Sequence, residues 1–288
     1  MLHRGGGRTK LPAMLIVRTL AELRDTCARL RAVHGSIALV PTMGALHDGH
    51  CALVRAAGGA GIVASIFVNP LQFGANEDFA RYPRDEAADL AALDSAGCHL
   101  AWLPDVAVMY PPGDATTIAL GGPAERWEGD VRPGHFRGVA TVCAKLFGQV
   151  RPDRAYFGEK DWQQLQVVTR MVADLHLPLR IVGVPTVREA DGLALSSRNR
   201  YLSAAERAVA PGLFAVLSET ARLLGEGRDA AELLTQGHDE LERGGFRVDY
   251  FALVDATTLE PLPVTRRSAR LIAAARLGAV RLIDNVAV

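Results

Sequence analysis

Two hydrophobic periods alternate along most of this chain, and that alternation restricts its fold more than any other feature. Short runs of consecutive apolar residues, typical of buried strands, are separated by longer segments with helical spacing. The expected strands are 36–40, 61–68, 99–103, 155–157 and 180–184, and the expected helices are 19–33, 50–57, 84–96, 139–150 and 161–175. Because strand–helix–strand repeats make parallel sheets, we expect an α/β fold, a Rossmann-like parallel sheet with helices on both faces.

The pattern changes after about residue 185. Capping pairs at Ser203 and Glu206 and at Asp229 and Glu232 predict two helices, running to about residues 224 and 243. Strand-like runs follow at 248–254, 271–275 and 280–283. We therefore expect a Rossmann-like domain over 14–185 and a smaller C-terminal α+β domain over 186–288, with residues 1–13 a disordered extension.

Composition excludes several classes of function. The 288 residues carry 32 Lys and Arg against 32 Asp and Glu, so the net charge is zero. Such a balance argues against nucleic-acid or anionic-membrane binding as the main activity, and the apolar runs are too short to cross a bilayer. The four scattered cysteines favour a protein of the reducing cytoplasm over a disulfide scaffold.

The segment Pro41-Thr-Met-Gly-Ala-Leu-His-Asp-Gly-His50 is the most informative one. It joins a predicted buried strand, which we expect Pro41 to end, to a predicted helix. Loops at the carboxyl ends of parallel strands are where such sheets bind ligands. His47 and His50, three residues apart on a first helical turn, would direct two imidazoles at an anion held by the helix N-terminus. Helix capping and a zinc pair are the alternatives for these histidines.

Three further segments place polar groups after predicted strands. Asn69 and Gln72 follow the second predicted strand, where they could bind a small polar substrate or simply form a turn. Lys160 lies before a helix that Asp161 and Gln164 could begin as a capping box. Finally, Arg198 offers a planar, permanently charged fork for phosphate, in a polar loop that could also be a linker.

Residues 129–138, Gly-Asp-Val-Arg-Pro-Gly-His-Phe-Arg-Gly, form a Gly-rich basic run. We expect it to be irregular, either a mobile flap in which Arg132 contacts a ligand or a plain surface loop.

The segment 41–50 closely resembles the signature of the pantothenate synthetase (pantoate–β-alanine ligase) family. That signature is a variant of the HIGH motif of class I aminoacyl-tRNA synthetases and related nucleotidyltransferases. The segments 65–73 with 81–84, 157–165 and 185–203 resemble the family's other motifs and occur in the family's order. The resemblance extends from about Met14 to the C-terminus, and the C-terminal part matches only in general pattern.

The resemblance implies the ATP-dependent condensation of (R)-pantoate with β-alanine through a pantoyl-adenylate, releasing pyrophosphate and AMP. It implies catalytic roles for His47, His50, Lys160 and Arg198. It implies an ATP site formed by Met43, Gly44, His47, His50, Gly158, Glu159, Lys160, Asp161, Val187, Leu195, Ser196, Ser197 and Arg198. It implies that Gln72, Gln164 and Asn69 bind pantoate, that Gln72, Tyr82 and Arg132 bind β-alanine, and that the C-terminal domain is a lid.

The resemblance also implies Mg²⁺ as cofactor and a homodimer. Asp89 matches an acidic position that some members use near Mg²⁺, but Ala88 and Ala92 leave the acidic cluster thin. The ion could instead be carried by the ATP phosphates and water.

Two other functions stay open on the residues alone. One is a HIGH-type nucleotidyltransferase that adenylates a phosphate ester, and the other is a non-catalytic nucleotide- or metal-binding module. A dinucleotide oxidoreductase and a P-loop enzyme are disfavoured, since neither GxGxxG after the first strand nor GxxxxGK[ST] occurs.

Overall fold

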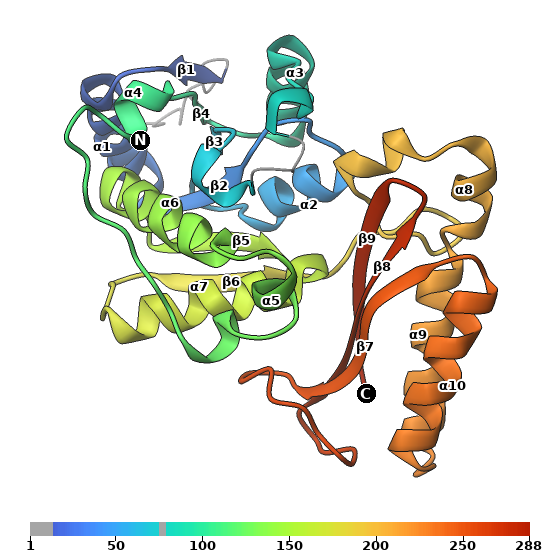
Figure 1. Cartoon of the computed structure of the whole chain (residues 1–288). Coiled ribbons are helices and arrows are strands. Elements are labelled where there is room, and N and C mark those ends of the chain that lie inside the picture. The colour runs from blue at the N-terminus through green and yellow to red at the C-terminus, as the bar shows by residue number, and fades with distance from the viewer. Residues whose placement is uncertain (1–13, 75–78) are drawn as a thin grey trace, which may run out of the picture.

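The computed structural model describes residues 14–74 and 79–288, so the predicted extension at 1–13 lies outside it (Figure 1). A six-stranded sheet fills the N-terminal part of the described chain, in the order β1-β4-β3-β2-β5-β6 with every pair parallel. Its strands are β1 Leu15–Val17, β2 Ile37–Thr42, β3 Gly61–Ile66, β4 Leu100–Trp102, β5 Arg154–Gly158 and β6 Arg180–Val184. The predicted parallel sheet is confirmed, with β1 as a strand that the sequence pattern did not reveal.

Helices cover both faces of this sheet because successive strand residues point to opposite sides. In β2, Ile37 and Leu39 join one core cluster, and Ala38 and Val40 join the other. The first cluster receives α1 (Leu20–His34), α6 (His135–Val150) and α7 (Trp162–Asp174), and the second receives α2 (Asp48–Ala56) and α3 (Glu86–Ala96). The shorter helices are η1 Pro70–Gln72, η2 Phe79–Arg81, α4 Val106–Met109, η3 Gly122–Ala124, α5 Glu128–Val131 and η4 Glu159–Asp161.

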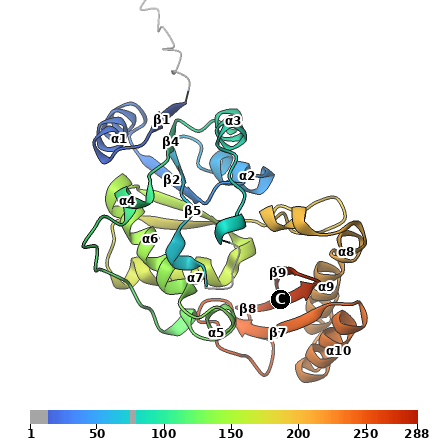
Figure 2. The ribbon, with the colours of Figure 1, turned by 45° about the horizontal axis from the view of Figure 1, so that its top comes forward.

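A second, antiparallel sheet is formed by β7 (Arg247–Asp255), β8 (Ala269–Leu277) and β9 (Val280–Ala287). One of its faces packs against α9 (Gly212–Gly225) and α10 (Ala230–Arg243), as Figures 1 and 2 show. The first sheet's last strand ends at Val184, next to the predicted boundary near residue 185. The segment between the sheets holds η5 (Ser197–Tyr201) and α8 (Ala204–Val209).

The helix expected to run from residue 203 to 224 is instead two helices, α8 and α9, and Pro211 stands at the N-cap of the second. Proline lacks the N–H that a continuous helix needs. By length and composition alone, Ala204–Gly225 could cross a membrane. Leu213, Leu217 and Leu224 of this segment lie buried in the core of the second sheet.

Two local predictions were wrong. Pro41 does not end the first strand: β2 continues to Thr42, and Pro41 pairs with Ser65 of β3. The ladder to β5 extends only over Ala38 and Leu39, so no neighbour requires the N–H that Pro41 lacks. The run 129–138 is not irregular either, because α5 and the start of α6 occupy it, joined by a short turn at Pro133 and Gly134.

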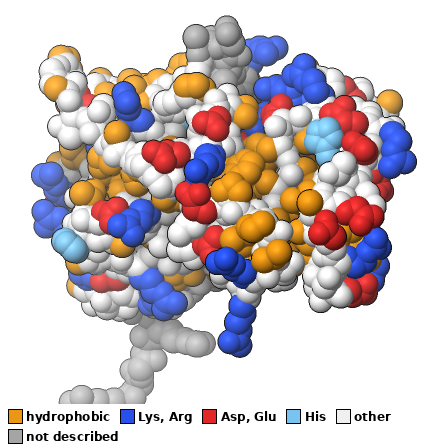
Figure 3. All heavy atoms as spheres, turned by 60° about the horizontal axis from the view of Figure 1, so that its bottom comes forward, with side chains coloured by type: hydrophobic (Ala, Val, Ile, Leu, Met, Phe, Trp, Pro, Cys, Tyr) orange, Lys and Arg blue, Asp and Glu red, His pale blue; other side chains and the backbone are white. Residues whose placement is uncertain are grey.

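Positive and negative side chains are interspersed on the face of the molecule that Figure 3 shows.

Contacts between the two parts of the chain include two indole donors. Trp127 Nε1 donates to the Leu259 carbonyl, and Trp162 Nε1 donates to the Ala256 carbonyl.

Candidate active site

The sheet order creates a crevice next to β2. Strand β2 has β3 on one side and β5 on the other, so the connections after β2 and β5 leave in opposite directions. Ligands bind in open α/β sheets at such a switch point, beyond the carboxyl ends of the strands. The loops that follow β2, β3, β5 and β6 meet there around a cavity of about 220 Å³.

Most predicted site residues line this cavity. They are Met43, His47, His50, Asn69, Gln72, Tyr82, Gly158, Lys160, Asp161, Gln164, Val187, Leu195, Ser196, Ser197 and Arg198. Gly44, Glu159 and Asp89 do not line it, and Arg132 lines a larger adjoining cavity of about 690 Å³ that also includes Lys160, Asp161, Ser196 and Arg198. The fold therefore gathers residues that are up to 155 positions apart in sequence, from Met43 to Arg198.

His47 and His50 form a pair at the start of α2. His47 is the N-cap residue and its Nδ1 accepts a hydrogen bond from the Gly49 amide at 3.1 Å, while His50 Nδ1 accepts from the His47 amide at 3.3 Å. The rings lie 4.1 Å apart between centroids. A Cβ at position 49 would come within 2.9 Å of the His47 ring, so glycine is required for this cap. The helix consequently begins at Asp48, two residues before the predicted start.

Both histidines are neutral near pH 7. Burial, with the nearby Lys160, lowers the pKa of His47 to about 4. Burial lowers the pKa of His50 to about 3, and the neighbouring His47 and Lys160 add to this effect. Because each Nδ1 accepts from a backbone N–H, each neutral ring carries its proton on Nε2. The pair therefore offers two N–H donors to a ligand rather than two positive charges.

Asp89 of α3 supports the loop after β2. Its two carboxylate oxygens accept from the amides of Ala45 at 3.0 Å and Leu46 at 2.7 Å. Gly44 and Ala45 both have positive φ, and a Cβ on Gly44 would lie 2.7 Å from the Asp89 carboxylate. Among the residues described, no cluster of three or more His, Cys, Asp or Glu side chains could hold a metal ion. Asp89 thus has the contacts of a loop anchor.

Asn69 and Gln72 are buried at the end of β3. The Asn69 amide nitrogen donates to Gln72 Oε1 and to the Gly138 carbonyl, and its oxygen accepts from the Leu71 amide and the Tyr110 hydroxyl. These contacts use both donors and both acceptor positions of the side chain, so Asn69 orients Gln72 while lining the cavity. The Gln72 nitrogen faces Met43 Sδ at 3.1 Å, on the cavity side.

Two residues of the 129–138 run fix the backbone of Gln72. Arg132 Nη1 lies 3.0 Å from His135 Nε2, and His135 Nδ1 lies 2.9 Å from the Gln72 carbonyl. Since arginine can only donate, His135 accepts on Nε2 and donates from Nδ1. The sequence had suggested Arg132 as a ligand contact but had not singled out His135.

Lys160 follows β5 in a short 3₁₀ helix, with its ammonium 3.8 Å from the Asp161 carboxylate. Asp161 precedes α7 but makes no side-chain cap, so the capping box with Gln164 is absent. Gln164 instead faces the cavity. After β6, the Ser196 hydroxyl accepts from the Arg198 amide at 3.3 Å and so caps η5.

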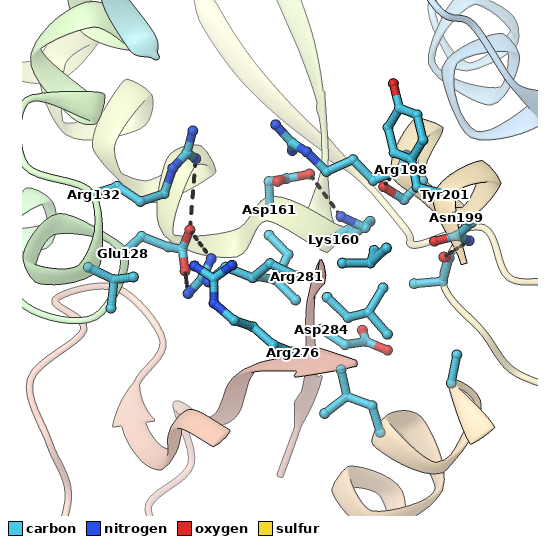
Figure 4. Close-up of a pocket in the computed structure, with 18 of the residues that line it drawn as sticks. Glu128, Arg132, Lys160, Asp161, Arg198, Asn199, Tyr201, Arg276, Arg281 and Asp284 are labelled. Carbon is cyan, nitrogen blue, oxygen red and sulfur yellow. Dashed lines mark hydrogen bonds and ion pairs between the residues drawn. The ribbon is translucent and has the colours of Figure 1, made fainter. Parts of the chain in front are cut away.

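The larger cavity lies between the two parts of the chain (Figure 4). Lys160, Asp161 and Arg198 border it on one side and Arg132 on another, while Arg276 and Arg281 come from the second sheet. Burial opposes ionisation of Glu128, yet its bonds to Arg281 keep the pKa of this carboxyl below its usual range. The sequence patterns did not reveal Glu128, Arg276 or Arg281 as site residues, since charged residues beside turns look like ordinary surface.

These features together define a Rossmann-like protein with a site for a phosphate-bearing ligand. They are a parallel sheet with a switch-point crevice, a helix start with two imidazole donors, and cations on two neighbouring loops.

Comparison with known proteins narrows that class. The family model for pantoate–β-alanine ligase matches residues 15–287. The pantothenate synthetase of Acidiphilium cryptum is 60% identical over 278 residues, which is 96% of this chain and the whole of that protein. The pantothenate synthetase of Granulibacter bethesdensis is 57% identical over 277 residues, 95% of this chain and 96% of that protein.

Solved structures similar to this chain come from the same family. The pantothenate synthetase of Thermus thermophilus superposes with a TM-score of 0.89 at 52% identity, over 95% of this chain and 99% of that one. A pantoate–β-alanine ligase of Francisella tularensis, complexed with β,γ-ATP and β-alanine, has a TM-score of 0.80 at 31% identity, over 95% of this chain and 97% of that one. The chain belongs to the pantoate–β-alanine ligase family.

Proposed function

We infer that the chain is an amide-forming ligase that condenses (R)-pantoate with β-alanine, using ATP and releasing pyrophosphate and AMP. The observation that carries this function is the convergence of four strand ends on one cavity with His47, His50, Lys160 and Arg198 around it. The phosphate-ester alternative and the non-catalytic module lose their support with the family match over 15–287.

The first step joins two anions. A pantoate carboxylate oxygen attacks the α-phosphorus of ATP, a new O–P bond forms, and the bond to the β-phosphate oxygen breaks as pyrophosphate leaves with its electron pair. We assign Lys160 and Arg198 to the charge that builds on the phosphates. The two Nε2–H groups of His47 and His50 donate hydrogen bonds there without adding net charge.

Substrate positioning falls to the amides. We assign the Gln72 nitrogen and Gln164 to pantoate, because both border the cavity beside its apolar wall of Val142, Leu146 and Phe157. The remaining ATP contacts are proposed for Met43, Gly158, Asp161, Val187, Leu195, Ser196 and Ser197. In the second step the β-alanine amine attacks the activated carbonyl carbon, AMP leaves, and the amine loses a proton. Gln72, Tyr82 and Arg132 are the proposed β-alanine contacts.

Mg²⁺ would arrive as part of the substrate, bound to the ATP phosphates and water, since the described side chains form no cage for it. We further propose a homodimer and a cytoplasmic location, with no nucleic-acid or membrane partner, consistent with balanced charge and four free cysteines.

Measurement of AMP release tests this function directly. ATP and pantoate alone should yield bound adenylate and pyrophosphate with little free AMP, and β-alanine should release AMP and pantothenate in equal amounts. AMP release that does not depend on β-alanine, or a dinucleotide-like product, would contradict the assignment.

Substitution of the proposed catalytic groups gives a second test. His50→Ala and Lys160→Ala should each lower pantoate-dependent ATP–pyrophosphate exchange by about 10²–10³-fold, as loss of a preorganised charge-stabilising donor does. The circular dichroism spectrum should stay unchanged. Wild-type exchange rates in either variant would refute the role of that residue.

A further inference from the structure

The second sheet places two adjacent buried polar side chains in one strand, whose remaining residues are apolar apart from Arg281. Asp284 and Asn285 of β9 are each only 4% exposed. Successive strand residues point to opposite faces, so the two side chains leave β9 in opposite directions. Each reaches a segment that carries a proposed phosphate-binding cation.

Asn285 holds the segment of Lys160. Its amide nitrogen donates to the carbonyls of Glu159 and Lys160, both at 2.9 Å. Arg270 Nε donates to the Asn285 oxygen at 2.5 Å, which fixes the orientation of the amide. The Arg270 guanidinium also stacks on Trp162, 3.4 Å from the ring centroid. The backbone on both sides of Lys160 is therefore fastened to the second sheet.

Asp284 holds the hairpin that precedes Arg198. Its carboxylate receives a forked pair from Arg188 at 2.5 and 2.9 Å, and Arg188 also donates to the Gly192 carbonyl. Arg188 is bridged to Ala194 across the same hairpin, and its guanidinium stacks over Phe214 of α9 at 3.6 Å. The hairpin leads directly into Ser196, Ser197 and Arg198.

We propose that Asn285 is a positioning residue for Lys160 and Asp284 a positioning residue for Arg198, each by tying its cation-bearing segment to the same strand. The inference rests on the proposed function of those two cations. Strand β9 is rigid because it pairs with β8 along its length. Neither segment can therefore move away from β9 without breaking a hydrogen bond to Asp284 or Asn285. Misplacement of a catalytic group by about 1 Å can cost about 10²-fold in rate.

Double-mutant cycles on pantoate-dependent ATP–pyrophosphate exchange separate this role from a general loosening of the fold. Asn285→Ala should slow exchange about 10–100-fold. In a Lys160→Ala background it should have less than about a twofold further effect, because the group it positions is gone. In an Arg198→Ala background its effect should persist in full.

Asp284→Asn tests the tie to the hairpin that precedes Arg198 and keeps the shape of the side chain. Its effect should vanish in the Arg198→Ala background and persist with Lys160→Ala. If Asn285→Ala fails to fold, as a thermal melt would show, this second pair of cycles still tests the inference.

Trp127→Phe is the matched control, since it removes one hydrogen bond between the two parts of the chain, to the Leu259 carbonyl, and touches neither segment. It should leave exchange within about twofold of wild type. The inference would be overturned if Asn285→Ala and Asp284→Asn each slowed exchange by the same factor in the Lys160→Ala and in the Arg198→Ala background. Absence of exchange in the wild-type protein would instead overturn the proposed function.

Discussion

Hydrogen bonds within the protein distinguish the supporting residues of the site from those that we propose as ligand contacts. Asn69 uses both donors and both acceptor positions within the protein. The Asp89 carboxylate is engaged by the Ala45 and Leu46 amides. Lys160 and the Gln72 nitrogen, by contrast, face the cavity. Residue type alone could not distinguish these roles, because an amide or a carboxylate at a strand end serves either purpose.

The role of Asp89 can be tested against metal ligation. Asp89→Asn replaces one acceptor oxygen by an NH₂ group that meets an amide donor, so the loop after β2 should shift and adenylation should slow about 10-fold or more. The Mg²⁺ concentration for half-maximal activity should stay the same. An order-of-magnitude rise in that concentration would show that Asp89 is a ligand.

Asp94→Asn is the control for this experiment, because Asp94 lies on the same helix and is exposed. It should change neither the rate nor the Mg²⁺ requirement.

At the scale of elements, the close approach of α6 to η1 positions Gln72. A Cβ on Gly138 would lie 2.1 Å from the Leu71 carbonyl oxygen and 2.6 Å from the Gln72 amide nitrogen, both backbone atoms. The helix can therefore lie against the segment after β3 only with glycine at this position.

Gly138→Ala should consequently lower the free energy of unfolding by about 1–3 kcal/mol, the cost of overpacking, and raise the KM for pantoate. Gly148→Ala on the same helix is the matched comparison, since a Cβ there meets no atom within 4 Å. It should stabilise the protein by about 0.5–1 kcal/mol. Equal denaturation midpoints for the two variants would contradict this account.

Element boundaries could be predicted where the sequence carries its own signal. The capping boxes at Thr19 and Ser203 are both present, and Gly97 ends α3 in a left-handed conformation. The predictions failed where a tertiary contact replaced the local signal. Pro41 stays in β2 because β5 does not pair alongside it. In the run 129–138, α6 already begins at His135, and its Gly138 packs on η1.

At the scale of the whole molecule, a buried ion pair joins the two parts of the chain. Glu128 of α5 and Arg281 of β9 lie 2.6 Å apart with side chains 8% and 13% exposed, and Tyr250 donates to the same carboxylate. Arg281 also pairs with Asp249. Loss of Arg281 would leave the buried Glu128 carboxylate with only Arg132, 3.9 Å away, and the Tyr250 hydroxyl to compensate its charge.

Arg281→Met should therefore destabilise the protein by about 3–5 kcal/mol in urea unfolding. The double variant Glu128→Gln with Arg281→Met should recover part of that loss. Arg126→Met, which breaks the exposed pair with Glu260 between the same two parts, should have little effect. Equal losses for the buried and the exposed pair would contradict the importance of burial.

The sequence by itself determined the parallel sheet, the family and the residues that gather at the cavity, because periodicity and contiguous motifs are local properties of the chain. The tertiary structure decided what those residues can do. The neutral state of His47 and His50 follows from burial beside Lys160. The support given by Asp89, His135, Asp284 and Asn285 depends on contacts across 43 to 126 positions of sequence. Desolvation and hydrogen-bond partners are set by neighbours in space, and no pattern along the chain records them.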